Sequence, residues 1–507
     1  MKQLTIIFAL LLLVTCKDNQ PTNEYLGVVN ITISGKQKAL PYFERGLLLL
    51  HSFEFEDAAE AFQKAREIDP NMPMAYWGEA MTYNHPLWSE QDYEAATEVL
   101  NELQEIDLEK HATELESDFI KSVFILYKPK MEKKERDVAY AAFMADLNEK
   151  YPSNHEVAAF YAISLLGSVP EGRDDLLYGQ GAKIAQGILK ENPNHPGALH
   201  YLIHSYDDPE HANLALDAAN AYSQVAPDAS HALHMPSHIY VAMGMWDQVI
   251  SSNINSYQAS LNRMEAKNLD NDARGYHAFH WLEYGYLQKE NQEEAKKMVL
   301  EMQQYATETP SKRARVHLVF LKGTYLVGTD SWNDKEVADI PVDITDLNIS
   351  IRSQYQFLEG MKAFKAGNTQ ALDSVLKTMN TDHQRESFVI AEGSAKLCSN
   401  VNRGEVTQTD MIESEIRQNQ LQGLRATMDN DPILAEEYFL KSIALEESIS
   451  YSFGPPHIQK PTHELYADWL LTQNRNKEAE EQYTLTLKAA PKRTKALKGI
   501  QISKETI

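Results

Sequence analysis

The stretch LPYFERGLLLLHSFEFEDAAEAFQKAREIDP, residues 40–70, decides the fold that we predict for this chain. Gly46, Ala58, Phe62, Ala65 and a closing Pro70 stand at fixed places in it. This spacing is typical of a repeat of about 34 residues that forms two antiparallel helices. The apolar stripe of such a helix pair is too wide to be buried alone, so each pair must stack on its neighbours.

In these residues the chain resembles the tetratricopeptide repeat superfamily. The same frame fits two later segments, which end at Pro227 and Pro491, and it fits less closely around Tyr76, Gly360 and Gly423. The resemblance implies an all-α, right-handed superhelical solenoid of antiparallel helix pairs. It also implies a concave groove in which ligands bind. Insertions are predicted near residues 85–150 and 325–350.

The predicted organisation follows from where the repeats are recognisable. It comprises a signal peptide (1–15), a tether (16–36), N-terminal repeats with an insertion (37–150), central histidine-rich repeats (151–310), connecting helical repeats (311–415) and C-terminal repeats with a cap (416–507).

Length and composition limit the class of protein. At 507 residues the chain is longer than one compact core usually requires, as expected for a repeat array. Its 43% apolar and 24% charged residues are those of an ordinary folded protein. The net charge of −25 opposes binding to a polyanion, so we expect no nucleic-acid partner.

The first residues, MKQLTIIFALLLLVTC, form an apolar run after Lys2 that is too short to cross a bilayer. The end of this run resembles the lipobox of bacterial lipoproteins, which implies lipidation of Cys16. Export to the bacterial cell envelope follows, with the lipid as the only contact with the membrane. A plain secretory signal is the alternative. The only other cysteine is Cys398, so a lipidated Cys16 excludes an intramolecular disulfide. The oligomeric state stays open.

Histidine recurs in one register of three successive repeats, in GALHYLIHSYDD, SHALHMPSHIYV and YHAFHWLEYGYL. Seven of the 17 histidines are involved: His200, His204, His231, His234, His238, His277 and His280. They occupy the second, fifth and ninth positions of the first helix, which make one stripe beside the packing stripe. In the resembled superfamily that stripe lines the groove.

Histidines three or four residues apart on a helix have the spacing of metal ligands. We predict a site built first from His200, His204, His234 and His238, then from His277 and His280, with Asp207 as an oxygen ligand. Zinc, copper and iron all suit imidazole. The alternative is a set of core or groove histidines that are each satisfied by a hydrogen bond and bind no metal.

Two carboxylates stand at positions that a repeat normally fills with small or apolar residues, Glu283 and Glu79. A buried carboxylate is costly unless it is paired, so each is a candidate base beside a metal-bound water. The alternative is a local salt bridge with Arg45 or Arg274.

Aromatic residues near the histidines would give the groove a lining suited to a small molecule or a peptide. The candidates are His231, Trp281, Tyr284 and Trp77, and ordinary repeat packing is the alternative for the aromatic residues. Gly454-Pro455-Pro456 predicts a stiff, non-helical loop. It would either cross the groove and present His457, or serve as a spacer between repeats.

No phosphate-binding, dinucleotide-binding or hydrolase motif is present in the sequence. The first functional hypothesis is therefore a histidine-lined transition-metal site, which a metal-dependent enzyme acting on a small molecule would use. The alternatives are a non-catalytic scaffold that binds a peptide or partner protein in its groove, and delivery of the metal without catalysis.

Overall fold

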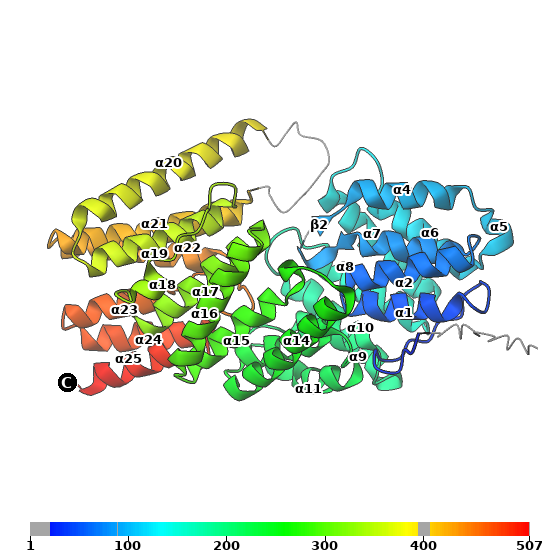
Figure 1. Cartoon of the computed structure of the whole chain (residues 1–507), viewed down its shortest axis with the longest axis horizontal. Coiled ribbons are helices and arrows are strands. Elements are labelled where there is room, and N and C mark those ends of the chain that lie inside the picture. The colour runs from blue at the N-terminus through cyan, green and yellow to red at the C-terminus, as the bar shows by residue number, and fades with distance from the viewer. Residues whose placement is uncertain (1–20, 89, 394–405, 506–507) are drawn as a thin grey trace, which may run out of the picture.

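The computed structural model describes residues 21–88, 90–393 and 406–505, with side chains omitted for 389–393. The lipidation predicted for Cys16 and the argument from Cys398 lie outside the described residues. Within them the chain is almost entirely helical, which confirms the predicted all-α class (Figure 1). The strand content of these ranges is one two-stranded pairing of β1 with β2, in which Asn84 lies opposite Gln91.

The first half of the chain runs from blue to green in Figure 1. Its elements are α1 (Leu40–His51), α2 (Phe55–Ile68), α3 (Pro73–Thr82), β1 (Asn84–His85), η1 (Pro86–Trp88), β2 (Glu90–Gln91), α4 (Tyr93–Gln104), α5 (Leu108–His111), α6 (Glu114–Leu126), α7 (Lys133–Lys150), α8 (His155–Gly167), α9 (Asp175–Glu191), α10 (Pro196–Ser205), η2 (Ala212–Ala215), α11 (Leu216–Val225), α12 (Ser230–His234), α13 (Pro236–Ala242) and α14 (Trp246–Lys267).

The second half runs from green to red and ends at the opposite side of the molecule (Figure 1). Its elements are η3 (Asn271–Ala273), α15 (Tyr276–Gln288), α16 (Gln292–Glu308), α17 (Lys312–Thr329), α18 (Lys335–Ala338), α19 (Ile349–Lys365), α20 (Thr369–Gly393), α21 (Gln408–Met428), α22 (Pro432–Ser448), α23 (Thr462–Thr472), α24 (Asn476–Ala489) and α25 (Thr494–Glu505).

The repeat residues allow neighbouring helices to approach closely. The ring of Phe62 on α2 lies against Gly46 on α1 and Gly78 on α3, where an added Cβ would come within 2.7 Å and 2.3 Å of ring carbons. A side chain at either glycine would therefore displace the ring. This contact explains why the pattern in residues 40–70 needs a small residue on one helix and an aromatic residue on the next.

Consecutive helices pack on one another along the chain, and their apolar faces form two large buried cores. The first core runs from Leu26 to Val249 and also takes in Trp281 and Tyr284. The second runs from Tyr276 to Ala496. Helix α15 contributes to both, so the histidine-rich repeats lie where the two halves join.

The array is coiled tightly enough for its first repeat to contact a much later one. Helix α1 packs against α10. The segment before α1 also follows the end of α9, since the Val28 N–H donates to the Asn194 carbonyl at 2.9 Å. This contact between distant repeats brings the end of α1 beside the histidines of α10.

Pro236 divides the helix that was expected to carry three histidines. Proline lacks an N–H and its ring clashes with the preceding turn. As a result α12 ends at His234, and α13 begins at Pro236 and carries His238. The expected i, i+4 pair on one continuous helix is therefore a pair across a break.

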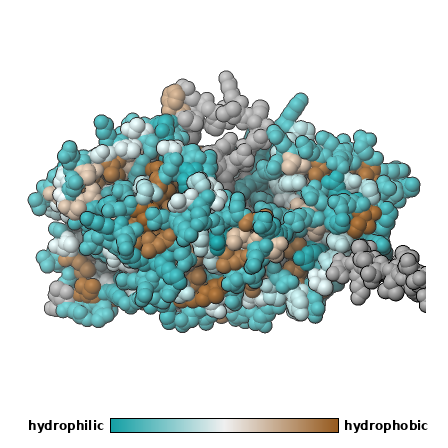
Figure 2. All heavy atoms as spheres, in the orientation of Figure 1, coloured by the Kyte–Doolittle hydropathy of each residue, from teal (hydrophilic) through white to brown (hydrophobic). Residues whose placement is uncertain are grey.

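The visible face is mostly hydrophilic, with small, separate apolar areas (Figure 2). None of the described helices is long and apolar enough to serve as a membrane span.

Candidate metal centre

Six of the seven predicted histidines come together from four helices. Two groups of three form, and within each group one potential ligand atom per residue lies within 4.8 Å of the others. The first group is His200, His204 and His231, and the second is His234, His238 and His277. The rings of His204 and His238 join the groups, with centroids 5.2 Å apart.

Hydrogen bonds on the Nδ1 side fix the tautomers of three histidines. The His200 Nδ1 lies 2.7 Å from the carbonyl oxygen of His51, which can only accept, so this nitrogen carries the proton. One oxygen of Asp207 accepts from Nδ1 of both His204 and His238, at 3.3 and 3.0 Å. In each ring the Nε2 atom is left with its lone pair.

His234 is oriented in the same way by Asn253 on α14. The Asn253 amide nitrogen donates to the Val249 carbonyl at 2.8 Å, so its oxygen faces the imidazole. That oxygen accepts from the His234 Nδ1 at 2.7 Å. Histidine ligands of metals typically donate their other N–H to a carboxylate or carbonyl in this manner.

Three of the four Nε2 atoms have no hydrogen-bond partner among the described residues. The Nε2 atoms of His204, His234 and His238 are buried and accept no hydrogen bond from the described residues. The His200 Nε2 lies 3.1 Å from the Nε2 of His231. Burial lowers the pKa of His234 to about 4, and burial together with neighbouring imidazoles holds the pKa of His200 and His238 well below 6.5. At neutral pH these three rings are uncharged and able to bind a metal ion.

Asp207, predicted as an oxygen ligand, forms with His204 and His238 a further group whose potential ligand atoms lie within 4.8 Å of one another. Its Oδ2 accepts from both imidazoles, and its Oδ1 lies 3.2 Å from Arg173. Asp207 thus supports one ring from each histidine group.

Aromatic side chains enclose the second group. Trp281 stacks on His238 at 4.6 Å, and Phe453 lies 4.7 Å from the same ring. Phe453 comes from the loop between α22 and α23, and the next residue, Gly454, lies so close to Trp281 that an added Cβ would be 2.2 Å from the indole. This loop therefore lies against the histidine cluster through Phe453, but His457, which it was expected to present there, pairs with Glu413 instead.

Four other predicted residues lie elsewhere. His280 bonds Thr324 at 2.9 Å, and His457 pairs with Glu413 at 2.8 Å. Trp77, expected on the groove, packs in the core between Phe119 and Phe160. Tyr284, also expected there, packs against Trp246 and borders a separate cavity.

Neither candidate base belongs to the groups of potential metal ligands among the described residues. Glu79 is held by Gln63 and Arg66, so its salt bridge forms with a different arginine from the two considered. Glu283 is fully buried, and neither of its carboxyl oxygens has a hydrogen-bond partner in the described ranges. Burial raises the pKa of Glu283 well above 4.5, which favours the neutral carboxyl in the folded protein.

Replacing Glu283 with glutamine tests this protonation state. The native pKa is raised above that of the unfolded chain, so the native state binds more protons and wild-type stability falls as pH rises above 4.5. Glutamine cannot ionise. We expect urea unfolding to show E283Q gaining about 1.4 kcal/mol relative to wild type for each pH unit above 4.5, up to the native pKa. The exposed-site control E293Q should show no such trend, and a pH-independent difference for E283Q would contradict a buried neutral carboxyl.

Another group of ligand-type residues, His51, Glu156 and His195, was not foreseen as a unit. The His51 Nε2 and the His195 Nε2 donate to the two oxygens of Glu156 at 2.7 and 3.2 Å. The remaining nitrogens accept from the Tyr201 hydroxyl and the Ala198 N–H. Every donor and acceptor is used, so this group stabilises the fold. It shows what a satisfied histidine cluster looks like in this protein.

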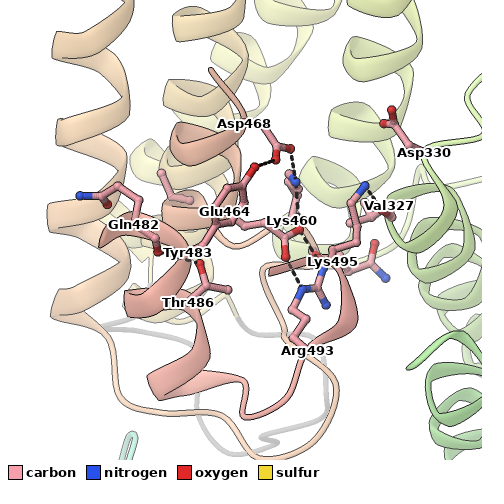
Figure 3. A network of polar contacts seen from close by, with 12 residues as sticks. Val327, Asp330, Lys460, Glu464, Asp468, Gln482, Tyr483, Thr486, Arg493 and Lys495 are labelled. Atoms are coloured by element: carbon pink, nitrogen blue, oxygen red, sulfur yellow. Dashed lines mark hydrogen bonds and ion pairs between the residues drawn. The ribbon is translucent and has the colours of Figure 1, made fainter. Parts of the chain in front are cut away.

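A cavity of about 260 Å³ lies apart from the histidines, between α15, α17 and the last three helices. Its lining includes Tyr284, Gln288, Tyr483, Arg493 and Lys495. The Lys495 ammonium donates to the Val327 carbonyl at 3.0 Å, and no carboxylate among the described residues lies within ion-pair distance of it (Figure 3). Burial lowers the pKa of Lys495.

The fold and the histidine site define an all-α, helical-repeat protein with a cluster of imidazoles. No family model matches the chain, and no curated protein matches it. Among solved structures it is similar to yeast Tom70, with 11% identity over 92% of this chain and 88% of that chain and a TM-score of 0.32. It is also similar to the human IFIT1 dimer with m7Gppp-AAAA, with 12% identity over 94% and 91% and a TM-score of 0.32. The TPR domain of P58(IPK) is 14% identical over 92% and 98%, with a TM-score of 0.22.

Proposed function

We propose that this protein binds a divalent transition metal through the Nε2 atoms of its clustered histidines. The proposal rests on the contrast between the two nitrogen atoms of each imidazole ring, Nδ1 and Nε2. Nδ1 is bound to a carbonyl or carboxylate oxygen, while the Nε2 atoms of His204, His234 and His238 are buried without a partner in the part of the chain that the structure describes. A buried polar atom without a partner is costly, and a metal ion would remove that cost.

The donor set favours zinc or copper, with iron as a further candidate. Imidazole nitrogens are the majority of the potential ligand atoms in the cluster, with one carboxylate, Asp207, beside them, and Zn²⁺ and Cu²⁺ are ions that commonly take such ligands. Asp207 and Asn253 would set the orientation of the rings, as residues behind metal ligands generally do. Because Glu283 and Glu79 lie outside the cluster, we propose metal binding and not a reaction that uses either residue as a base.

Removal and return of metal tests this function. The purified chain is stripped with a chelator, dialysed, and titrated with Zn²⁺ or Cu²⁺ by calorimetry, with elemental analysis of the loaded protein. We expect micromolar or tighter binding in wild type and at least tenfold weaker binding in His204→Ala/His238→Ala. His111→Ala, outside the cluster, is the matched control and should bind as wild type does. Failure of the wild-type chain to bind either ion would overturn the proposal.

A second candidate function is favoured by the cavity beside Lys495. The cavity of about 260 Å³ is lined by Arg493, Lys495 and Lys498 together with the carboxylates of Glu290 and Asp468, and Lys495, which has no ion-pair partner among the described residues, suits the anionic end of a small molecule or peptide. The protein would then be a scaffold that captures a partner without metal. The test compares a short peptide that has a free terminal carboxylate with the same peptide as its terminal amide. If the protein takes up no metal and binds the first peptide but not the second, this function is favoured.

For the location of the protein we propose the bacterial cell envelope, with lipid on Cys16 as the anchor. The support is the apolar leader followed by Leu13-Val14-Thr15-Cys16 in the sequence.

A further inference from the structure

We infer that the histidine cluster is a centre for two metal ions, each held by three imidazoles. This inference rests on the proposed metal binding and specifies its stoichiometry. The two groups, His200/His204/His231 and His234/His238/His277, share no residue. Each has its three potential ligand atoms within 4.8 Å of one another, so closure by about 1 Å would bring them to the spacing around a four-coordinate ion.

One ion cannot use all six rings. An ion with imidazole ligands at about 2 Å needs all donor atoms within about 4 Å of one another. Among the described residues, no set of potential ligand atoms that lie within 4.8 Å of one another takes in more than three of the six histidines. Ring centroids within a group are 4.6 to 6.5 Å apart. Between the groups the nearest ring centroids are those of His204 and His238, at 5.2 Å.

Asp207 ties the two groups into one unit. Its Oδ2 accepts from His204 of the first group and from His238 of the second. A single carboxylate thus orients one ligand of each ion, and Arg173 holds its other oxygen. Displacement of this carboxylate would disturb both sites together.

Each group also reaches solvent through one member. His231 is partly exposed and His277 is exposed, whereas the other four histidines are buried. Ions could therefore enter each group without unfolding of the helices. Three neutral ligands leave a further position on each ion, and two divalent ions beside one carboxylate carry excess positive charge. The exchangeable ligand of this centre is accordingly a small anion, such as hydroxide or an oxyanion.

The test counts ions in wild type and in a variant of each group. With Cu²⁺, wild type should bind two equivalents, and His200→Ala/His231→Ala and His234→Ala/His277→Ala should bind one each. Circular dichroism and thermal melts would confirm that each variant is folded. The electron paramagnetic resonance signal per copper should be strongly reduced in wild type, where neighbouring ions couple, and normal in each variant.

The outcomes separate this inference from the proposed function. One equivalent in wild type would overturn the two-ion centre and leave metal binding intact. Two equivalents with full, uncoupled signals would also overturn it, because the ions would then lie far apart. No bound copper would overturn both. In Asp207→Asn, two copper ions could still bind while the electron paramagnetic resonance signal per copper returns to normal. This result would show that Asp207 sets the distance between the two ions.

Discussion

Replacing Glu464 with leucine is expected to remove about 3–5 kcal/mol from the unfolding free energy of the C-terminal repeats, since it leaves the buried Arg493 without its carboxylate and Lys460 with Asp468 alone. Glu464 is fully buried, receives Arg493 at 2.6 Å and lies 2.9 Å from Lys460 (Figure 3). These cations hold the pKa of Glu464 well below 4.5 despite its burial. The carboxylate therefore stays charged at any pH at which the protein is studied.

Urea unfolding followed by circular dichroism measures this effect. The matched control is Glu478→Gln on α24, because Glu478 forms a surface ion pair with Arg475 at the same end of the molecule. Exposed pairs contribute under about 1 kcal/mol. If E464L and E478Q shift the unfolding midpoint equally, the buried network is not a main source of stability in these repeats.

Replacing Glu156 with leucine should cost a similar amount, about 3–5 kcal/mol, and should also weaken metal binding. The variant removes the acceptor of two buried imidazole N–H groups, those of His51 and His195. His51 is also the residue whose carbonyl orients His200. Loss of a residue behind a metal ligand typically lowers affinity by 10- to 100-fold, so we expect a loss of that size in the first group.

The same unfolding and titration measurements test both effects. Glu191→Gln is the matched control, because Glu191 accepts from the more exposed His155 at 3.1 Å. It should leave the unfolding midpoint and metal affinity close to wild type. An E156L protein with wild-type stability would show that the buried triad does not hold α1, α8 and α10 together. Lost stability with unchanged metal affinity would show that His200 does not need the His51 carbonyl.

Much of the fold could be predicted from local pattern. Gly46, Ala58 and Phe62 mark a helix pair because the contact they make, an aromatic ring against a small residue on the next helix, lies within one repeat and its neighbour. The gathering of His200, His204, His234 and His238 was also predictable, since repeats that stack in register bring equivalent positions together.

The roles of individual residues at the site were less predictable. Asp207 was predicted as a ligand by its type and its place in the sequence, but its hydrogen bonds to the Nδ1 atoms of His204 and His238 and its ion pair with Arg173 could not be predicted. Asn253 gave no signal in the sequence, because it is an ordinary polar residue on the second helix of its repeat. Phe453 lies more than 200 residues from His238 along the chain, and only the coiling of the array brings them together.

The amino-acid sequence by itself determined the helical class, the stacking of repeats and the register in which imidazoles recur, since all three depend on spacing along the chain. Tertiary structure alone decided which nitrogen of each ring is left free. That choice depends on acceptors supplied by a distant carbonyl on α1, an amide on α14 and a turn after α10. Hydrogen bonds between distant segments follow from how the helices are packed in space, and residue spacing carries no record of them.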